Sequence, residues 1–303
     1  YLVRRLIGAL LVLLAVSFAV FVALTYVPGD AAESLVGENA SAEQLAAVRQ
    51  EFGLDAPLPV RYARFVAGVV TRGDLGRSLV SGRAVSDLLA ERWPPTLILA
   101  LTAMSLAVVL GTAAGSLAAS RPGSRLDLAV MSASSFGLAL PTYWAALLLV
   151  MFFSLGLKWL PVAGAGSPAH LILPAVTLAL PTLAVVARLM RSSLLEVLHA
   201  DFLRTARGKG LHPRQIFLDH TLRNSLIPVV TLLGLHLGHL LGGAFVIETI
   251  FAWPGLGRLT VQAIFDRDLP VVLGAALLVA MLNVTINLGV DLAHAALDPR
   301  VGR

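Results

Sequence analysis

The sequence predicts an all-α membrane protein with six transmembrane helices. Of its 303 residues, 57% are hydrophobic and only 14% are charged. A typical soluble domain is about a quarter charged, so the polar groups here are too few to cover a globule of this size. The surplus apolar surface is expected to face lipid. Long uncharged runs recur along the chain, and basic residues gather between them, as is typical of a multi-pass protein.

Six uncharged runs are long enough to cross a bilayer, which takes about 20 apolar residues. They are Leu6–Val27, Thr96–Ala118, the run between Asp127 and Lys158, a run from about Leu171, the run between Arg223 and Glu248, and the run between Asp268 and Asp291. The first resembles a signal peptide, but its 22 residues exceed the usual apolar core of about 7–15. We therefore expect a retained span. Pro141, Pro174 and Pro181 are expected to mark kinks.

The distribution of Lys and Arg predicts that both termini are cytoplasmic. With the N-terminus inside, 13 of them lie on inner segments and three on the two short outer loops. The first outer segment carries seven more, but loops longer than about 60 residues have little influence on orientation.

Three regions are predicted: an N-terminal segment with the first span (1–27), a small helical extracytoplasmic subdomain (28–92), and a core with five spans (93–303). In the subdomain, Ala42–Phe52 has helical spacing, with Ser41 as N-cap and Gly53 as stop. Pro59–Val70 is a second candidate helix. The core contains one large inner loop, 191–226.

The inner loop is expected to hold a short helix, a glycine turn and a second amphipathic helix. Lys209 and Gly210 end the first helix, and Pro213 lies near the start of the second. Small and basic residues in this arrangement suit docking against a soluble partner. Alternatively, the loop is a positive segment that only sets topology, and composition leaves both interpretations open.

An ordered set of motifs resembles one family, the ABC importer permeases for dipeptides, oligopeptides and nickel. The resemblance covers essentially the whole chain. The matching segments are Tyr1–Leu6, Pro28–Asp30, Gly73–Ser78, Thr205–Leu211, Leu222–Pro228, Glu248–Leu259 and Leu297–Arg300. The general permease pattern, EAA-x3-G-x9-I-x-LP, is altered in two ways. Arg204-Thr205-Ala206 stand at the EAA positions, and Gly210 and Pro228 are five residues further apart than the glycine and proline of that pattern. The peptide and nickel branch shares both departures.

The resemblance implies a type I ABC importer permease fold and half of a translocation pathway, in the inner or plasma membrane of a prokaryote. The implied partners are a second homologous permease, giving a heterodimer, two cytoplasmic ABC ATPases and an extracytoplasmic solute-binding protein. The implied mechanism is alternating access, driven through an ATPase-coupling segment. That segment consists of Arg204, Thr205, Ala206, Arg207, Gly208, Lys209 and Gly210.

The chain itself is expected to be non-catalytic and to bind no cofactor. The nearest string to a phosphate-binding G-x-x-x-x-G-K-[ST] loop is Gly208-Lys209-Gly210, which lacks the spacing and the hydroxyl. ATP and Mg are therefore expected at the partner ATPases. The chain has no cysteine, which excludes thiolate metal sites and Cys nucleophiles.

Several polar or small residues inside the predicted spans are candidates for lining the path or packing helices. His236 and His239 share one face and either line the path or hydrogen-bond a neighbouring helix. Two histidines alone make a poor metal site, so no metal ligand is assigned. Gly234, Gly238 and Gly242 form a small-residue stripe that favours close helix crossing, within this chain or with the second permease.

Two further groups have alternative interpretations. Asn283 and Asn287, four residues apart, either line the path or bridge helices. Glu248, Trp253 and Arg258 lie at the predicted outer mouth, where they form a gate or anchor the span at the interface.

The alternative functions are import of nickel, a metal chelate or another small solute by the same family, and secondary transport. A secondary carrier needs ionisable coupling groups in its spans, and these contain none except histidine. An intramembrane hydrolase is disfavoured because no G-x-S-x-G motif is present.

Overall fold

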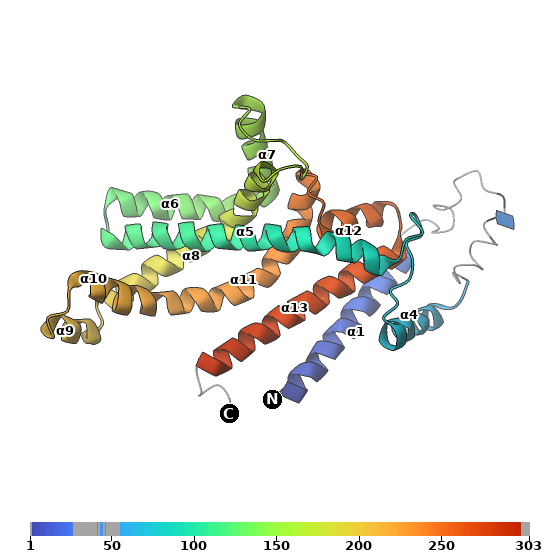
Figure 1. The fold of residues 1–303 in the computed structure, drawn as a ribbon, viewed down its shortest axis with the longest axis horizontal. Coiled ribbons are helices and arrows are strands. Elements are labelled where there is room, and N and C mark those ends of the chain that lie inside the picture. The colour runs from blue at the N-terminus through green and yellow to red at the C-terminus, as the bar shows by residue number, and fades with distance from the viewer. Residues whose placement is uncertain (1, 27–40, 42, 45, 47–54, 298–303) are drawn as a thin grey trace. The chain divides into compact units, whose positions relative to one another are not determined.

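The computed structural model describes residues 2–26, 41, 43–44, 46 and 55–297, which are helical almost throughout (Figure 1). In this part of the chain, the one extended pairing is an isolated antiparallel bridge between Arg77 and Ala84. The all-α prediction is confirmed. The chain forms two compact units: unit 1 contains the described residues up to Thr96 and Pro254–Leu288, and unit 2 contains Leu97–Trp253 with residues 289–297.

Unit 1 begins with α1 (Leu2–Tyr26), against which α4 (Leu58–Arg72) packs. The Tyr62 hydroxyl donates to the Leu14 carbonyl at 3.0 Å. The Tyr62 ring also meets those of Phe18 and Phe21 edge-on, with centroids 5.2 and 5.5 Å apart. Arg61 lies over the Phe21 ring, and its partial burial lowers the pKa of its guanidinium. These contacts attach α4 to the apolar helix α1.

The two helices predicted for the subdomain have different outcomes. Pro59–Val70 is confirmed as α4, which ends where Gly73 takes a left-handed backbone (φ 64°). Ser41 is confirmed as an N-cap, because its Oγ accepts from Gln44 N at 3.2 Å and its own N–H donates to Gln44 Oε1 at 2.9 Å. Gly53 and most of Ala42–Phe52 lie outside the described residues.

The rest of unit 1 is built from the start of α5 (Val85–Ser120), α12 (Leu256–Phe265) and α13 (Leu269–Leu297). Their shared core is apolar and holds Val85, Leu88, Leu89, Leu256, Ala263, Val271, Val272 and Ala275. Two polar contacts fix this core. Asp268 accepts from the Ser78 hydroxyl and from Leu79 N (3.0 Å), and Leu256 N donates to Thr96 Oγ1 at 2.7 Å.

Unit 2 is organised around α8 (Ala169–Leu198), which contacts α6 (Arg125–Ala139), α7 (Thr142–Leu149) and α11 (Arg223–Ile250). The remaining helical pieces are η1 (Val150–Gly156), α9 (Asp201–Gly208), α10 (Pro213–Gln215) and η2 (Ile216–Leu222). The largest core cluster includes Leu99, Ala103, Ala146, Leu178, Ile247 and Phe251. Six of its 13 buried residues are alanines, and such small side chains let the helices approach closely.

Three helices are long and apolar enough to cross a membrane: Val85–Ser120, Ala169–Leu198 and Leu269–Gly289. The number rises to five if two bent helix pairs each count as one span, and Ile7–Ala23 is a shorter apolar helix. Each predicted run falls on one of these elements, while the count of six stays a prediction.

The predicted third span is broken at Pro141, where α6 and the α7–η1 pair meet at 107°. Proline disfavours helical backbone in the preceding residue, and Leu140 is accordingly extended (φ −74°, ψ 122°). The expected kink is therefore a full interruption. Pro174 and Pro181, by contrast, lie inside the continuous helix α8.

Candidate functional site

The segment singled out for docking has the predicted helix–turn–helix form. α9 ends where Lys209 N donates to the Thr205 carbonyl at 3.0 Å, and Gly210 takes a left-handed backbone (φ 75°) that glycine adopts without strain. Pro213 then opens α10. The irregular part is shorter than the predicted loop 191–226, because α8 continues to Leu198 and helical structure resumes at Pro213.

One small apolar cluster attaches this segment to the longer helices. Leu203 of α9 is 1% exposed and Ile216 of η2 is 7% exposed, and both pack with Val197 and Leu198 at the end of α8. A turn alone would leave α9 free to pivot. With its apolar side buried against two other elements, α9 is held in a defined position.

Hydrogen bonds order the backbone that follows. The Thr221 hydroxyl donates to the Ile216 carbonyl at 3.1 Å, and the Ser225 hydroxyl donates to the Thr221 carbonyl at 2.8 Å. η2 is a widened π-helical turn, a form frequent at functional sites. Its polar side chains satisfy the backbone that the widened turn disturbs.

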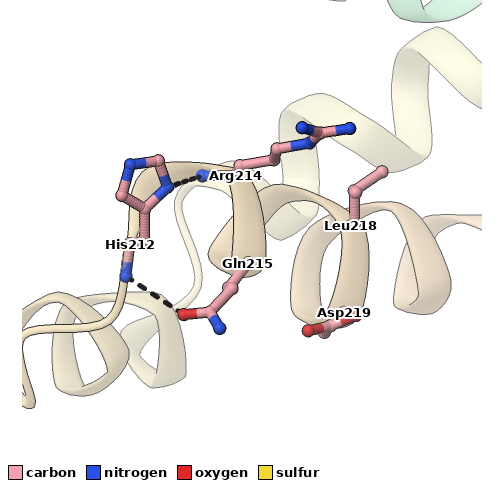
Figure 2. A pocket seen from close by; sticks show the side chains of 5 residues that line it. All are labelled: His212, Arg214, Gln215, Leu218 and Asp219. Carbon is pink, nitrogen blue, oxygen red and sulfur yellow. Dashed lines mark hydrogen bonds between the residues drawn. The ribbon is translucent and has the colours of Figure 1, made fainter.

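Outside the cluster, the segment presents a mixed apolar and charged surface. Phe202 is 44% exposed, and Leu211, Phe217 and Leu218 are also exposed. An open hollow of about 420 Å³ follows the turn, lined by His212, Arg214, Gln215, Leu218 and Asp219 (Figure 2). Exposed aromatic and aliphatic side chains beside charges are typical of a protein-binding surface.

The two charged residues that line the hollow, Arg214 and Asp219, are both exposed. His212 folds back on the segment: its N–H donates to Gln215 Oε1 at 3.4 Å, and its Nδ1 accepts from Arg214 N at 3.3 Å (Figure 2). Among the side chains that the structure describes, which exclude those of Arg204 and Arg207, the Arg214 guanidinium and the Asp219 carboxylate form no ion pair. Of the predicted coupling residues, Lys209 and Thr205 are exposed, while the side chains of Arg204, Ala206 and Arg207 lie outside the described part.

The candidates on the predicted fifth and sixth spans lie on different units. His236 of α11 is half-buried and has an interaction partner, while the side chain of His239 is outside the described part. A Cβ at Gly242 would meet no described atom within 4 Å, and Gly234 and Gly238 are half-buried. On α13, the Asn283 amide donates to the Val279 carbonyl of its own helix at 3.0 Å, and Asn287 is exposed.

The predicted outer-mouth residues are also divided between the units. Glu248 (0% exposed) and Trp253 are buried in unit 2, where Trp253 N donates to the Glu248 carbonyl at 2.8 Å. Arg258 is exposed on α12 of unit 1. Trp253 packs in the largest apolar core cluster, and its predicted role, as a gate or as an interfacial anchor, stays a prediction.

Sequence reasoning missed several contacts that organise the two units. Asp127 and Arg191 form a partly buried ion pair, although both entered the sequence argument only as markers of span ends. Gly111 and Gly115, a G-x-x-x-G pair, let α5 pack closely on α8, whereas the sequence argument considered only the glycine stripe of α11. Both contacts had a signal in the sequence. For the ion pair it was the presence of opposite charges beside two spans, and for the glycine pair it was the four-residue spacing on an apolar run.

Comparison with known proteins covers the whole chain. Residues 111–303 match a family described as "Binding-protein-dependent transport system inner membrane component", and residues 1–100 match its N-terminal membrane component. The glutathione transport system permease protein GsiC of Escherichia coli (strain K12) is 42% identical over 301 residues, covering 99% of this chain and 98% of that protein. GsiC of Salmonella paratyphi A is 43% identical with the same coverage.

Two solved structures share the fold. An inward-facing structure of the MetNI methionine ABC transporter covers 72% of this chain and 98% of its own, with a TM-score of 0.56 and 20% identity. An amino acid ABC transporter solved with histidines covers 71% and 94%, with a TM-score of 0.53 and 15% identity.

Proposed function

The chain belongs to the family of binding-protein-dependent transport system inner membrane components, and we propose that it carries short peptides. It is a multi-pass permease subunit of an ABC importer. Identity of 42–43% over almost the full length of the glutathione transport permeases carries this proposal. Glutathione is itself a short peptide, so the dipeptide, oligopeptide and glutathione substrates form one chemical class. The proposed cargo is an extended, zwitterionic peptide delivered by a solute-binding protein on the outer side.

The proposed assembly follows the same argument. A second homologous permease completes the translocation pathway as a heterodimer, and two ABC ATPases bind from the cytoplasm. ATP and Mg are held by those ATPases, and this chain performs no hydrolysis. The termini are proposed to be cytoplasmic, as the distribution of Lys and Arg predicts.

The proposed ATPase contact is residues 204–210 of α9 and its turn. Its support is the small apolar cluster of Leu203, Ile216, Val197 and Leu198, which holds α9 against the end of α8. A segment that passes movement from one subunit to another must be packed against the helices that move. The exposed Phe202 is suited to a pocket on the ATPase.

The second candidate substrate is nickel or a metal chelate, the other cargo of the resembling family. Among the described residues, no group of three or more His, Cys, Asp or Glu is placed to hold a metal ion. A metal chelate could still be carried as an organic solute without a metal site in the chain. The two cargo classes are therefore distinguished by an uptake assay. Secondary transport without ATPases is the remaining alternative.

Reconstitution tests the proposal directly. The permease pair, the ATPases and the binding protein encoded beside them are incorporated into liposomes, and uptake of glutathione, a dipeptide, an oligopeptide and Ni²⁺ is measured with and without ATP. ATP-dependent uptake of a peptide, with no uptake of free Ni²⁺, is the expected result. Uptake that continues without ATPases or ATP would identify a secondary carrier instead.

A further inference from the structure

An ion pair between the half-buried Arg191 and the buried Asp127 fastens the turn between α5 and α6 to α8. Arg191 Nε donates to Asp127 Oδ1 at 2.5 Å, and Arg191 Nη2 donates to Oδ2 at 2.7 Å. Asp127 is only 4% exposed. A two-point contact between guanidinium and carboxylate fixes orientation as well as distance.

The same carboxylate also closes the turn. Asp127 Oδ2 accepts from Gly123 N at 2.9 Å, and Asp127 N donates to Ser124 Oγ at 3.2 Å, which caps α6. Three elements therefore meet at the Asp127 carboxylate: the turn after α5, the start of α6, and α8 at Arg191. Its loss would release all three at once.

Close backbone packing lies directly beside the ion pair. A Cβ at Gly115 of α5 would collide with the Ala187 carbonyl, lie 2.8 Å from Met190 Cβ and lie 3.1 Å from Arg191 N. Gly111, one turn earlier, meets α8 in the same way at Leu183 and Val186. Apolar contact of this kind resists separation of the helices but permits sliding along them, whereas the ion pair resists sliding.

From this junction, α8 runs directly into the proposed coupling segment. Arg191 lies about two helical turns before the end of α8, and that end packs on Leu203 and Ile216. In Figure 1 the turn between α5 and α6 lies toward the same end of unit 2 as α9 and α10. Movement of α9 therefore reaches Arg191 through a short continuous helix.

We propose that Asp127 and Arg191 are positioning residues that make α5 and α6 move as one body with α8 when the ATPases displace α9. This inference rests on the proposed function. Without the pair, α8 slides along α5 and α6 during the ATPase cycle. ATP is then hydrolysed without a matching change in the membrane helices, so transport is uncoupled from hydrolysis.

The test uses the complete reconstituted transporter and measures substrate taken up per ATP hydrolysed. Asp127→Asn and Arg191→Gln are expected to lower this ratio by about two- to thirtyfold, the range for residues along a coupling path. Arg191→Lys keeps the charge but loses the two-point guanidinium contact. Its ratio of uptake to ATP hydrolysis is expected to lie between those of these variants and wild type. Arg188→Gln removes an exposed arginine one turn away and serves as the matched control, with an unchanged ratio.

A reversible cross-link separates positioning from simple damage to the fold. Because the natural chain has no cysteine, the double variant Asp127→Cys/Arg191→Cys can be bridged by a bifunctional methanethiosulfonate reagent and released by dithiothreitol. The bridged protein is expected to recover the ratio, and the released protein to lose it again.

Each outcome decides between the proposals. Wild-type ratios in both single variants overturn the inference, and so does a loss that bridging leaves unrestored in complexes that retain their ATPases. If the wild-type complex shows no ATP-dependent uptake of any peptide, the proposed function itself fails. The failures are distinguishable because only the last result, the absence of peptide uptake, is measured on the unmodified transporter.

Discussion

Leu203 and Ile216 lie on opposite sides of the Gly210 turn and pack in one buried cluster, although the other described side chains of α9 are exposed. This contact converts two short helical pieces into one packed element at the end of α8. Its position makes it the attachment point of the proposed coupling segment, and it can be separated by mutation from the exposed surface next to it.

Leu203→Ala is expected to loosen α9 from the end of α8. Deleting a buried leucine usually costs about 2–5 kcal/mol, and a cluster this small has few other contacts to compensate. Hydrogen exchange of residues 201–222 should become faster in the variant, and uptake driven by ATP should fall. Protection that stays at the wild-type level would show that α9 is held by other contacts.

Phe202→Ala is the matched variant, because Phe202 is next to Leu203 in the sequence but is exposed. Removing it leaves the Leu203 cluster intact, so exchange protection should not change. If Phe202 enters a pocket on the ATPase, truncation should weaken ATPase binding by about 2 kcal/mol or more. Co-purification of the ATPase at increasing salt measures this, and unaltered retention contradicts the proposed contact.

Gly115→Ala is expected to force α5 and α8 apart. The added methyl would meet backbone and Cβ atoms that have no rotamer to change, and overpacking of this kind costs about 1–3 kcal/mol. The midpoint of thermal unfolding in detergent should fall. Gly123→Ala would be a poor control, because the φ of Gly123 is 73° and alanine would be strained there. The control is Gly8→Ala, at a position on α1 where an added Cβ has open space. Its unfolding midpoint should stay unchanged or rise.

Gly242→Leu tests whether the stripe on α11 faces a second permease. Gly242 is exposed, and a Cβ there would meet no described atom within 4 Å, so the stability of the isolated subunit should be preserved. If the stripe forms the contact between permeases, pairing with the second permease should be lost, as measured by cross-linking or gel filtration. Normal pairing would assign the exposed Gly242 to another environment, such as lipid.

Ser78→Ala and Asp268→Asn are expected to release the segment after α4. The buried Asp268 carboxylate accepts from the Ser78 hydroxyl and from Leu79 N, and an unsatisfied buried group costs about 1–3 kcal/mol. Limited proteolysis at Arg77 and Arg83 should therefore accelerate in both variants. Arg267→Gln, beside Asp268 but outside these hydrogen bonds, should leave the cleavage rate unchanged.

The sequence by itself determined the helical class, the positions of the apolar helices and the helix–turn–helix of the proposed coupling segment. These features depend on local properties: uncharged runs, the cap at Ser41, the left-handed glycine at Gly210 and proline near a helix start. They can be read from neighbouring residues because each depends on the residues within a turn or two.

Only the tertiary structure decided which distant residues meet. Asp127 and Arg191 are 64 residues apart, and Ser78 and Asp268 are 190 apart, so no local pattern links them. The break at Pro141 was foreseen as a kink, but its 107° angle follows from how α6 and α7 pack on α8. Partners of this kind are chosen by long-range packing, because a charge or a glycine beside a span has many possible neighbours until the helices are assembled.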